Sequence, residues 1–151
     1  MDVDWVTRAR PKTDRIACPW LIRRFIDADA VFRFVEPSAV LELADSTSAN
    51  SFDAPGATYT HRGDQCTFEV LLEDFGLTDN AALVRLARIV HAADVAGQLD
   101  TDPAGAGLLA IGVGGLEVEA DDQTLLARAS FVYDALYAWC QREVSHGETS
   151  R

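Results

Sequence analysis

The first third of the chain carries short apolar runs typical of strands, separated by one run with helical spacing. Residues 5–10 alternate two faces, one of them basic, and residues 31–35 are rich in β-forming types, so both segments are predicted strands. Residues 19–27 place their large apolar side chains on one helical face. A strand, a helix and a strand within about thirty residues predict a right-handed βαβ unit with parallel strands.

The segment that follows carries weaker signals. Residues 39–44 predict a short helix, and the small polar residues 45–51 predict a loop. Residues 58–61 predict a third short strand, whose alternation places Tyr59 and His61 on one face.

Helical periodicity dominates the second half of the chain. Helices are predicted at residues 65–75, 79–96, 104–111 and 121–143, with Gly76, Gly97 and Gly112 ending the first three and Thr78 capping the second. The last helix has the clearest apolar stripe, formed by Leu125, Ala129, Val132, Leu136 and Trp139. We predict one α+β domain over residues 1–151, in which a small sheet of about three strands, with one βαβ unit, is covered by a mainly helical second half. Residues 145–151 are expected to form a frayed tail.

Composition indicates a globular domain away from membranes and oxidising compartments. The chain has 151 residues, of which 48% are hydrophobic, and no apolar run approaches the roughly 20 residues needed to cross a bilayer. The first residues lack the basic and apolar build of a signal peptide. Three cysteines form no CxxC pair, which favours a reducing compartment, so we expect a cytoplasmic protein with no membrane partner.

The net charge of −11 is distributed unevenly. Residues 1–33 carry a net charge of +2, and the remaining residues carry −13. An acidic body repels phosphate backbones, so this domain alone is not expected to bind nucleic acid directly. The basic N-terminal segment suits a small anion better than a duplex.

Cys18 and its basic neighbours form the first candidate site. Proline suits the first turn of a helix, so Pro19 predicts a helix start with Cys18 as its N-cap. The positive helix end would lower the pKa of the thiol, which makes Cys18 a candidate catalytic nucleophile. Arg15, Arg23 and Arg24 are the candidate oxyanion-binding residues. The alternative is an inert core cysteine with solvated arginines.

Two histidines with acidic neighbours form the second candidate site. His91 and Asp94 are three residues apart on one predicted helix, and His61 precedes Glu69 near another helix start. Two imidazoles and two carboxylates suit zinc, iron or manganese, so these four residues are predicted metal ligands. The alternative is a hydrogen-bonded histidine–aspartate pair and a glutamate favoured by the helix dipole.

Four segments resemble the C-terminal domain of the chromate-resistance protein ChrB. They are DRIACPWLIRRFID (residues 14–27), HRGDQCTFE (61–69), HAAD (91–94) and YDALYAWC (133–140). The resemblance implies a role in chromate resistance, because ChrB is linked to chromate-dependent control of the genes for a chromate efflux transporter. It implies no catalytic reaction. Full-length regulators of this family carry an additional N-terminal region, so we expect any DNA-binding region to lie outside this chain.

Three functional hypotheses follow. The first is a chromate-responsive sensing domain that binds an oxyanion such as chromate, with a divalent metal beside it as an option. The second is a metal- or thiol-dependent enzyme acting on chromate or a small metabolite. The third is a structural module that forms a homodimer through the face from Tyr133 to Trp139.

Overall fold

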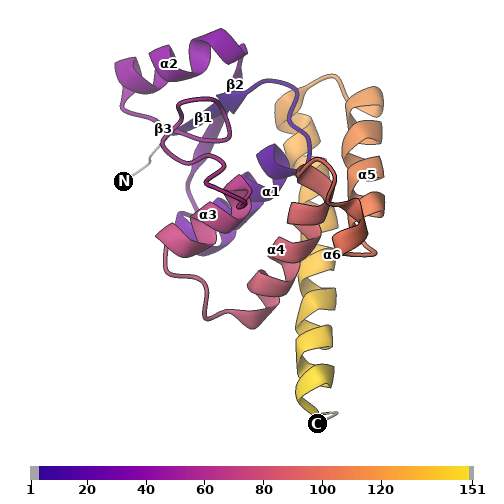
Figure 1. Ribbon diagram of the computed structural model, residues 1–151. Coiled ribbons are helices and arrows are strands. Elements are labelled where there is room, and N and C mark those ends of the chain that lie inside the picture. The colour runs from indigo at the N-terminus through magenta and orange to yellow at the C-terminus, as the bar shows by residue number, and fades with distance from the viewer. Residues whose placement is uncertain (1–3, 150–151) are drawn as a thin grey trace.

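A small parallel sheet lies at one end of the computed structural model, which describes residues 4–149 (Figure 1). The described residues form three strands in the order β2-β1-β3. The central strand β1 (Asp4–Arg8) pairs in parallel along its whole length with β2 (Val31–Val35) and more briefly with β3 (Asn50–Ser51). The predicted α+β class and the predicted parallel pairing of the first two strands are therefore confirmed.

The connection between β1 and β2 is helical but begins earlier than expected. Helix α1 (Asp14–Leu21) continues directly into a π-helical segment, Ile22–Ile26, before the chain returns to β2. The predicted start at Pro19 is wrong, because Pro19 lies inside α1. Pro19 inside the helix removes one backbone N–H donor. The helix nevertheless starts at Asp14, because an acidic side chain is favoured at the positive end of the helix dipole. Cys18 is consequently an interior helix residue and not an N-cap.

The third strand lies at a different place from the one predicted. A short 3₁₀ turn, Pro37–Ala39, leads into α2 (Val40–Thr47), and β3 follows within the segment that we expected to be a loop. Residues 58–61 form no strand, although Tyr59 makes an isolated bridge with Phe52. The polar residues of the β3 segment suggested a loop. A polar residue can be buried here because the Ser51 hydroxyl accepts a hydrogen bond from the Thr58 amide at 2.9 Å.

Four helices make up the second half of the described chain, as expected. They are α3 (Thr67–Asp74), α4 (Ala81–Asp94), α5 (Gly105–Val118) and α6 (Asp122–Thr149), with a 3₁₀ turn at Leu99–Thr101. Asn80, and not Thr78, caps α4 by accepting a hydrogen bond from the Leu83 amide. Gly112 does not end α5. A Cβ at Gly112 would lie 2.8 Å from the Lys12 Cγ, so this glycine permits close packing instead.

Helix α6 buries part of the predicted stripe and a neighbouring face: Leu125 is buried, and Ala129, Val132 and Leu136 pack against the core at partial burial. Leu126, Tyr133, Tyr137 and Cys140 are buried, whereas Trp139 remains 41% exposed. The two tyrosines pack against Trp20 of α1, so these two members of the proposed dimerisation face are buried within this chain, whereas Trp139 stays on the surface. The helix continues to Thr149, into the segment expected to be a frayed tail, and residues 150–151 of that tail lie outside the described residues.

The core joins the two halves of the molecule. Helices α1, α3, α4 and α6 pack together and cover the face of the sheet that carries Trp5 and Phe32. Across residues 4–149, no helix is both long and apolar enough to traverse a bilayer. This packing brings the last turn of α4 close to the first turns of α1 and α3 (Figure 1).

Candidate functional site

A pocket of about 270 Å³ opens where the carboxyl end of β1 meets the last turn of α4. Ligand sites in open parallel sheets commonly lie at this edge, since loops from neighbouring strands converge there. We call it the basic pocket, and it is lined by Arg8, Lys12, Arg15, Asp53, His61, Ala93 and Asp94.

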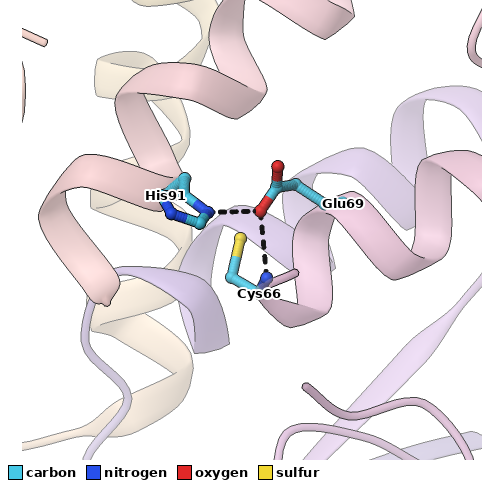
Figure 2. A group of neighbouring side chains, drawn as sticks. All are labelled: Cys66, Glu69 and His91. Atoms are coloured by element: carbon cyan, nitrogen blue, oxygen red, sulfur yellow. Dashed lines mark hydrogen bonds and ion pairs between the residues drawn. The ribbon is translucent and has the colours of Figure 1, made fainter. Parts of the chain in front are cut away.

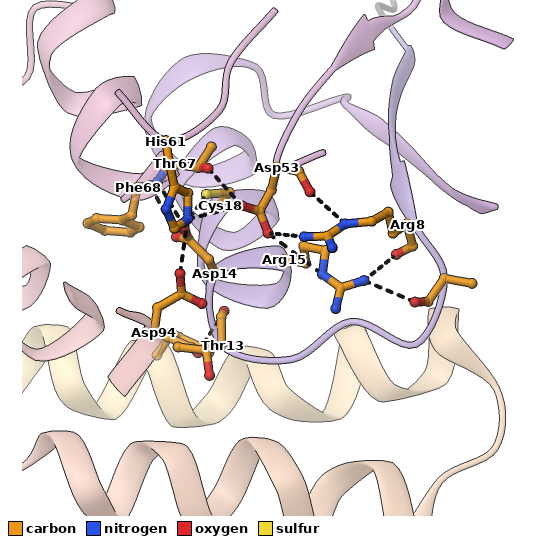
Figure 3. A network of polar contacts seen from close by, with 12 residues as sticks. Arg8, Thr13, Asp14, Arg15, Cys18, Asp53, His61, Thr67, Phe68 and Asp94 are labelled. Carbon is orange, nitrogen blue, oxygen red and sulfur yellow. Dashed lines mark hydrogen bonds and ion pairs between the residues drawn. The ribbon is translucent and has the colours of Figure 1, made fainter. Parts of the chain in front are cut away.

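Asp53 holds the two arginines of the basic pocket in place (Figure 3). The Arg8 Nε donates to the Asp53 carbonyl oxygen at 2.9 Å, and both guanidinium groups lie within 3.6 Å of the Asp53 carboxylate. Arg15 also donates to the carbonyl oxygens of Arg8 and Ala9, each at 3.0 Å. These contacts fix the positions of two cations at the sheet edge before any ligand binds.

His61 lies among three carboxylates. Its Nε2 is 3.1 Å from an Asp94 oxygen, 3.4 Å from Asp53 and 3.6 Å from Asp14 (Figure 3). Hydrogen bonds to Asp14 and Asp53 raise the pKa of His61 to about 10, although partial burial opposes this shift. The imidazole is therefore protonated at neutral pH and adds a further cation to the basic pocket.

The three carboxylates differ in charge. Burial opposes ionisation of Asp53, but hydrogen bonds from His61 and Thr67 outweigh it and lower the pKa of Asp53. Burial, followed by the charges of Asp14 and Asp53, raises the pKa of Asp94 to about 7. Burial also raises the pKa of Asp14. Four cations meet three carboxylates, so the basic pocket carries net positive charge at neutral pH even if all three carboxylates are ionised.

Asp14 is a scaffold for the pocket. Its fully buried carboxylate accepts hydrogen bonds from the backbone amides of Thr67 at 2.8 Å and Phe68 at 3.1 Å, at the start of α3. The Cys18 thiol donates to the same carboxylate at 3.4 Å. Asp14 therefore joins α1 to α3 and positions the acidic side of the basic pocket.

Lys12 lies on a strained loop. Arg10 and Thr13 both have positive φ values, of 57° and 45°, which is unusual for non-glycine residues and especially for a β-branched one. Tyr133 donates to the Thr13 carbonyl oxygen. Arg10 donates to three carbonyl oxygens and a carboxylate between the last turn of α5 and the first residue of α6. Within residues 4–149 the Lys12 ammonium makes no hydrogen bond or ion pair. Strain of this kind concentrates at functional sites.

The cysteine predicted as a nucleophile is buried. Cys18 is 0% exposed, and burial, followed by the negative charge of Asp14, raises the pKa of its thiol well above the ordinary value. The expected lowering of that pKa depended on a position at the helix start, which Cys18 does not occupy. These surroundings match the alternative interpretation, in which Cys18 is an inert residue of the core.

Only one of the three predicted oxyanion arginines lies in the basic pocket. Arg15 lines it, whereas Arg23 and Arg24 line another pocket, beside Trp20 and Asp134. Arg24 pairs with Asp134 at 3.2 Å, and Arg23 donates to the Ala30 carbonyl oxygen at 3.1 Å.

The four predicted metal ligands fall into two groups. His61 and Asp94 lie together with Asp14, whereas Glu69 and His91 lie together with Cys66. The His91 Nδ1 is 2.6 Å from a Glu69 oxygen, which also accepts a hydrogen bond from the Cys66 amide at 3.0 Å (Figure 2). We call Cys66, Glu69 and His91 the Cys–Glu–His cluster.

Several site residues were not among those predicted. Arg8 and Lys12 belong to the basic N-terminal segment, and Cys66 precedes Glu69 by the three residues of a capping box, so local signals existed for these. Asp14 lies within the first family-like segment, but nothing in the local sequence marks Asp53.

Comparison with known proteins places these residues in a family. The family described as "ChrB, C-terminal domain" matches residues 5–140, a range that contains the basic pocket and the Cys–Glu–His cluster. The chain belongs to the ChrB C-terminal domain family. Protein ChrB of Cupriavidus metallidurans is 42% identical over 133 residues, covering 88% of this chain. The match spans 39% of that ChrB protein, and no solved structure matches the chain.

Proposed function

We propose that this ChrB-family domain acts in chromate resistance as a sensing domain that binds chromate in the basic pocket. Membership of the ChrB family supports the role in chromate resistance. The observation that carries the binding site is the convergence of Arg8, Lys12, Arg15 and the protonated His61 on one pocket.

The chemistry of the pocket suits a tetrahedral dianion. Ionised donors form short, strong hydrogen bonds with oxyanions, and guanidinium groups can offer two parallel N–H donors. Asp53 already orients Arg8 and Arg15, so little side-chain freedom is lost when an anion binds. The Lys12 ammonium, without a partner among the described residues, supplies a cation free to turn toward the ligand.

Competition for His61 supplies a way to report occupancy. The His61 imidazolium pairs with Asp94 in the last turn of α4. An oxyanion that takes over part of this interaction would loosen Asp94 from the loop that carries His61. The two segments belong to different elements, so ligand binding would change how α4 is held against the sheet edge.

Calorimetric titration with chromate tests the proposal. We expect saturation at one anion per chain and a loss of affinity of about tenfold or more in Arg15→Gln and Lys12→Gln, since each variant loses a charge-assisted contact. Arg24→Gln is the matched control, because Arg24 lies in a different pocket, and its affinity should equal that of the wild type. Unchanged affinity in both pocket variants would refute the basic pocket as the binding site.

An absorbance assay separates a sensor from an enzyme. A sensing domain does not catalyse chromate reduction, so with a nicotinamide reductant the visible absorbance of chromate should fall no faster with the protein than in a protein-free control. Protein-dependent loss of that absorbance over many turnovers would instead favour the enzyme hypothesis. Cys18 is buried, which disfavours the form of that alternative in which Cys18 is the reactive thiol.

A further inference from the structure

We propose that the Cys–Glu–His cluster binds one divalent transition-metal ion of the zinc type. This site is separate from the basic pocket and goes beyond chromate binding. It also revises the predicted set of ligands, keeping Glu69 and His91, adding Cys66, and leaving out His61 and Asp94.

Three different metal-binding groups converge in this cluster. One ligand atom from each of Cys66, Glu69 and His91 lies within 4.8 Å of the other two. Figure 2 shows the Cys66 sulfur directed toward the space between the His91 ring and the Glu69 carboxylate. Zinc bonds of about 2.0–2.3 Å require the His91 and Glu69 atoms, now 2.6 Å apart, to separate by less than about 1 Å.

The types of ligand favour a transition metal over magnesium or calcium. A thiolate and an imidazole suit zinc and similar ions, whereas magnesium and calcium prefer sites made of oxygen atoms. Three protein ligands leave a fourth tetrahedral position for water. Two cavities adjoin the cluster, one of about 350 Å³ lined in part by His91 and one lined in part by Glu69 and His91, so water lies within reach of these two ligands.

The surroundings of the cluster are compatible with a cation. Cys66 and Glu69 lie at the positive end of α3, which favours a thiolate and a carboxylate, and His91 lies in the last turn of α4, near its negative end. Burial, followed by the charge of Asp14, raises the pKa of the Cys66 thiol, so an ion that binds there displaces its proton. The exposed Arg88 lines an adjoining cavity, where solvent screens its charge.

The other candidate set is less suited to a metal. The Asp14 carboxylate already accepts hydrogen bonds from two backbone amides and a thiol, and Arg8 and Arg15 pair with the neighbouring Asp53. By contrast, the second carboxylate oxygen of Glu69 and the Nε2 of His91 make no hydrogen bond within residues 4–149.

Cobalt(II) titration of the full chain, with the metal alone and no oxyanion present, tests the site. Thiolate ligation gives an intense near-ultraviolet charge-transfer band, which a hydrogen-bonded histidine–glutamate pair would not produce. We expect the band to saturate at one equivalent and zinc to abolish it by displacing cobalt. Cys66→Ser should lose the band, and His91→Gln should weaken cobalt affinity by at least about tenfold.

Three further variants keep the test decisive. Glu69→Gln retains an oxygen that can accept from the Cys66 amide, so it should stay folded by circular dichroism while binding cobalt more weakly. Cys140→Ser removes another buried thiol, and His61→Gln removes a histidine of the other group; both should keep the band. Absence of the band in the wild type, or its persistence in Cys66→Ser, would overturn the metal site. Either result would leave chromate binding in the basic pocket unaffected.

Discussion

The basic pocket and the Cys–Glu–His cluster both include a residue from the last turn of α4, yet they differ in charge. His91 and Asp94 are one turn apart on α4, but His91 faces Glu69 whereas Asp94 faces His61. The basic pocket gathers four cations around its carboxylates, and the cluster contains a thiol, one carboxylate and one imidazole. Similar histidine–carboxylate pairs are therefore suited to opposite ligands, because the neighbouring charges differ.

The two regions also differ in the role of their carboxylates, which act as scaffold in the basic pocket and are available to a ligand in the Cys–Glu–His cluster. Asp14 and Asp53 use their oxygens to hold α3, the two arginines and His61. Glu69 and His91 use only part of their hydrogen-bonding capacity on each other. The carboxylates of Asp14 and Asp53 are thus engaged in contacts within the protein, whereas one Glu69 oxygen and the His91 Nε2 make no hydrogen bond within residues 4–149.

The largest effect is expected from removing the scaffold carboxylate. Asp14→Ala should lower the free energy of unfolding by about 3 kcal/mol, because two buried amides and a thiol lose their acceptor at once. Urea unfolding followed by circular dichroism measures this. Asp134→Ala, which removes an exposed partner of Arg24, should cost less than about 1 kcal/mol. Equal losses in both variants would show that Asp14 is not a scaffold.

The next effect is a pH dependence confined to the basic pocket. The pKa of Asp94 is about 7, above its ordinary value, so lowering the pH through that range neutralises Asp94 and makes the pocket more positive. His61, with a pKa of about 10, keeps its charge throughout. Sulfate stays a dianion over the same range, and its affinity should rise by about tenfold between about pH 8 and about pH 6.

Asp94→Asn is the control for this titration. The variant should bind sulfate with a flatter pH profile, since the group that titrates is gone, and with an affinity near the low-pH value of the wild type. A profile as steep as that of the wild type would assign the titration to another group.

The smallest effect is expected from the packing of α5 against the loop that carries Lys12. Gly112→Ala would place a Cβ 2.8 Å from the Lys12 Cγ and 3.2 Å from the Thr13 Oγ1, so the loop must shift. Chromate affinity should fall by about threefold, whereas cobalt binding to the cluster should not change. Gly107→Ala in the same helix meets no atom within 4 Å and should stabilise the protein by up to about 1 kcal/mol with no loss of affinity. Equal chromate affinity in the two variants would contradict this account of the loop.

Local patterns predicted much of the fold. The β2 segment was located residue for residue, and the starts of the four helices of the second half were found to within two positions, because alternation and helical spacing are properties of short segments. The predicted ends of α5 and α6 fell several residues short. The start of α1 was missed because Pro19 is a strong signal for a helix start, and the contacts that favour Asp14 come from α3. The α6 stripe was incomplete, because Tyr133, Tyr137 and Cys140 were not counted as core residues.

The site was harder to predict because its contacts span long stretches of chain. Asp53 meets Arg8 across 45 residues, and Asp14 meets Phe68 across 54. No local periodicity encodes such pairs. The spacing of His91 and Asp94 correctly placed them one turn apart on one helix. It could not reveal that α4 passes between two groups of residues, so that His91 lies with Glu69 and Asp94 lies with His61.

The bond from Asp14 to the start of α3 has a consequence for the order of folding. Besides its local capping box, the first turn of α3 has two amides whose acceptor, Asp14, lies more than 50 residues earlier in the chain, so this turn is complete only after α1 has docked. Helix α3, with eight residues, is too short to be stable alone. The segment that supplies Cys66 and Glu69 therefore acquires its shape late, as a result of the assembly of the βαβ unit.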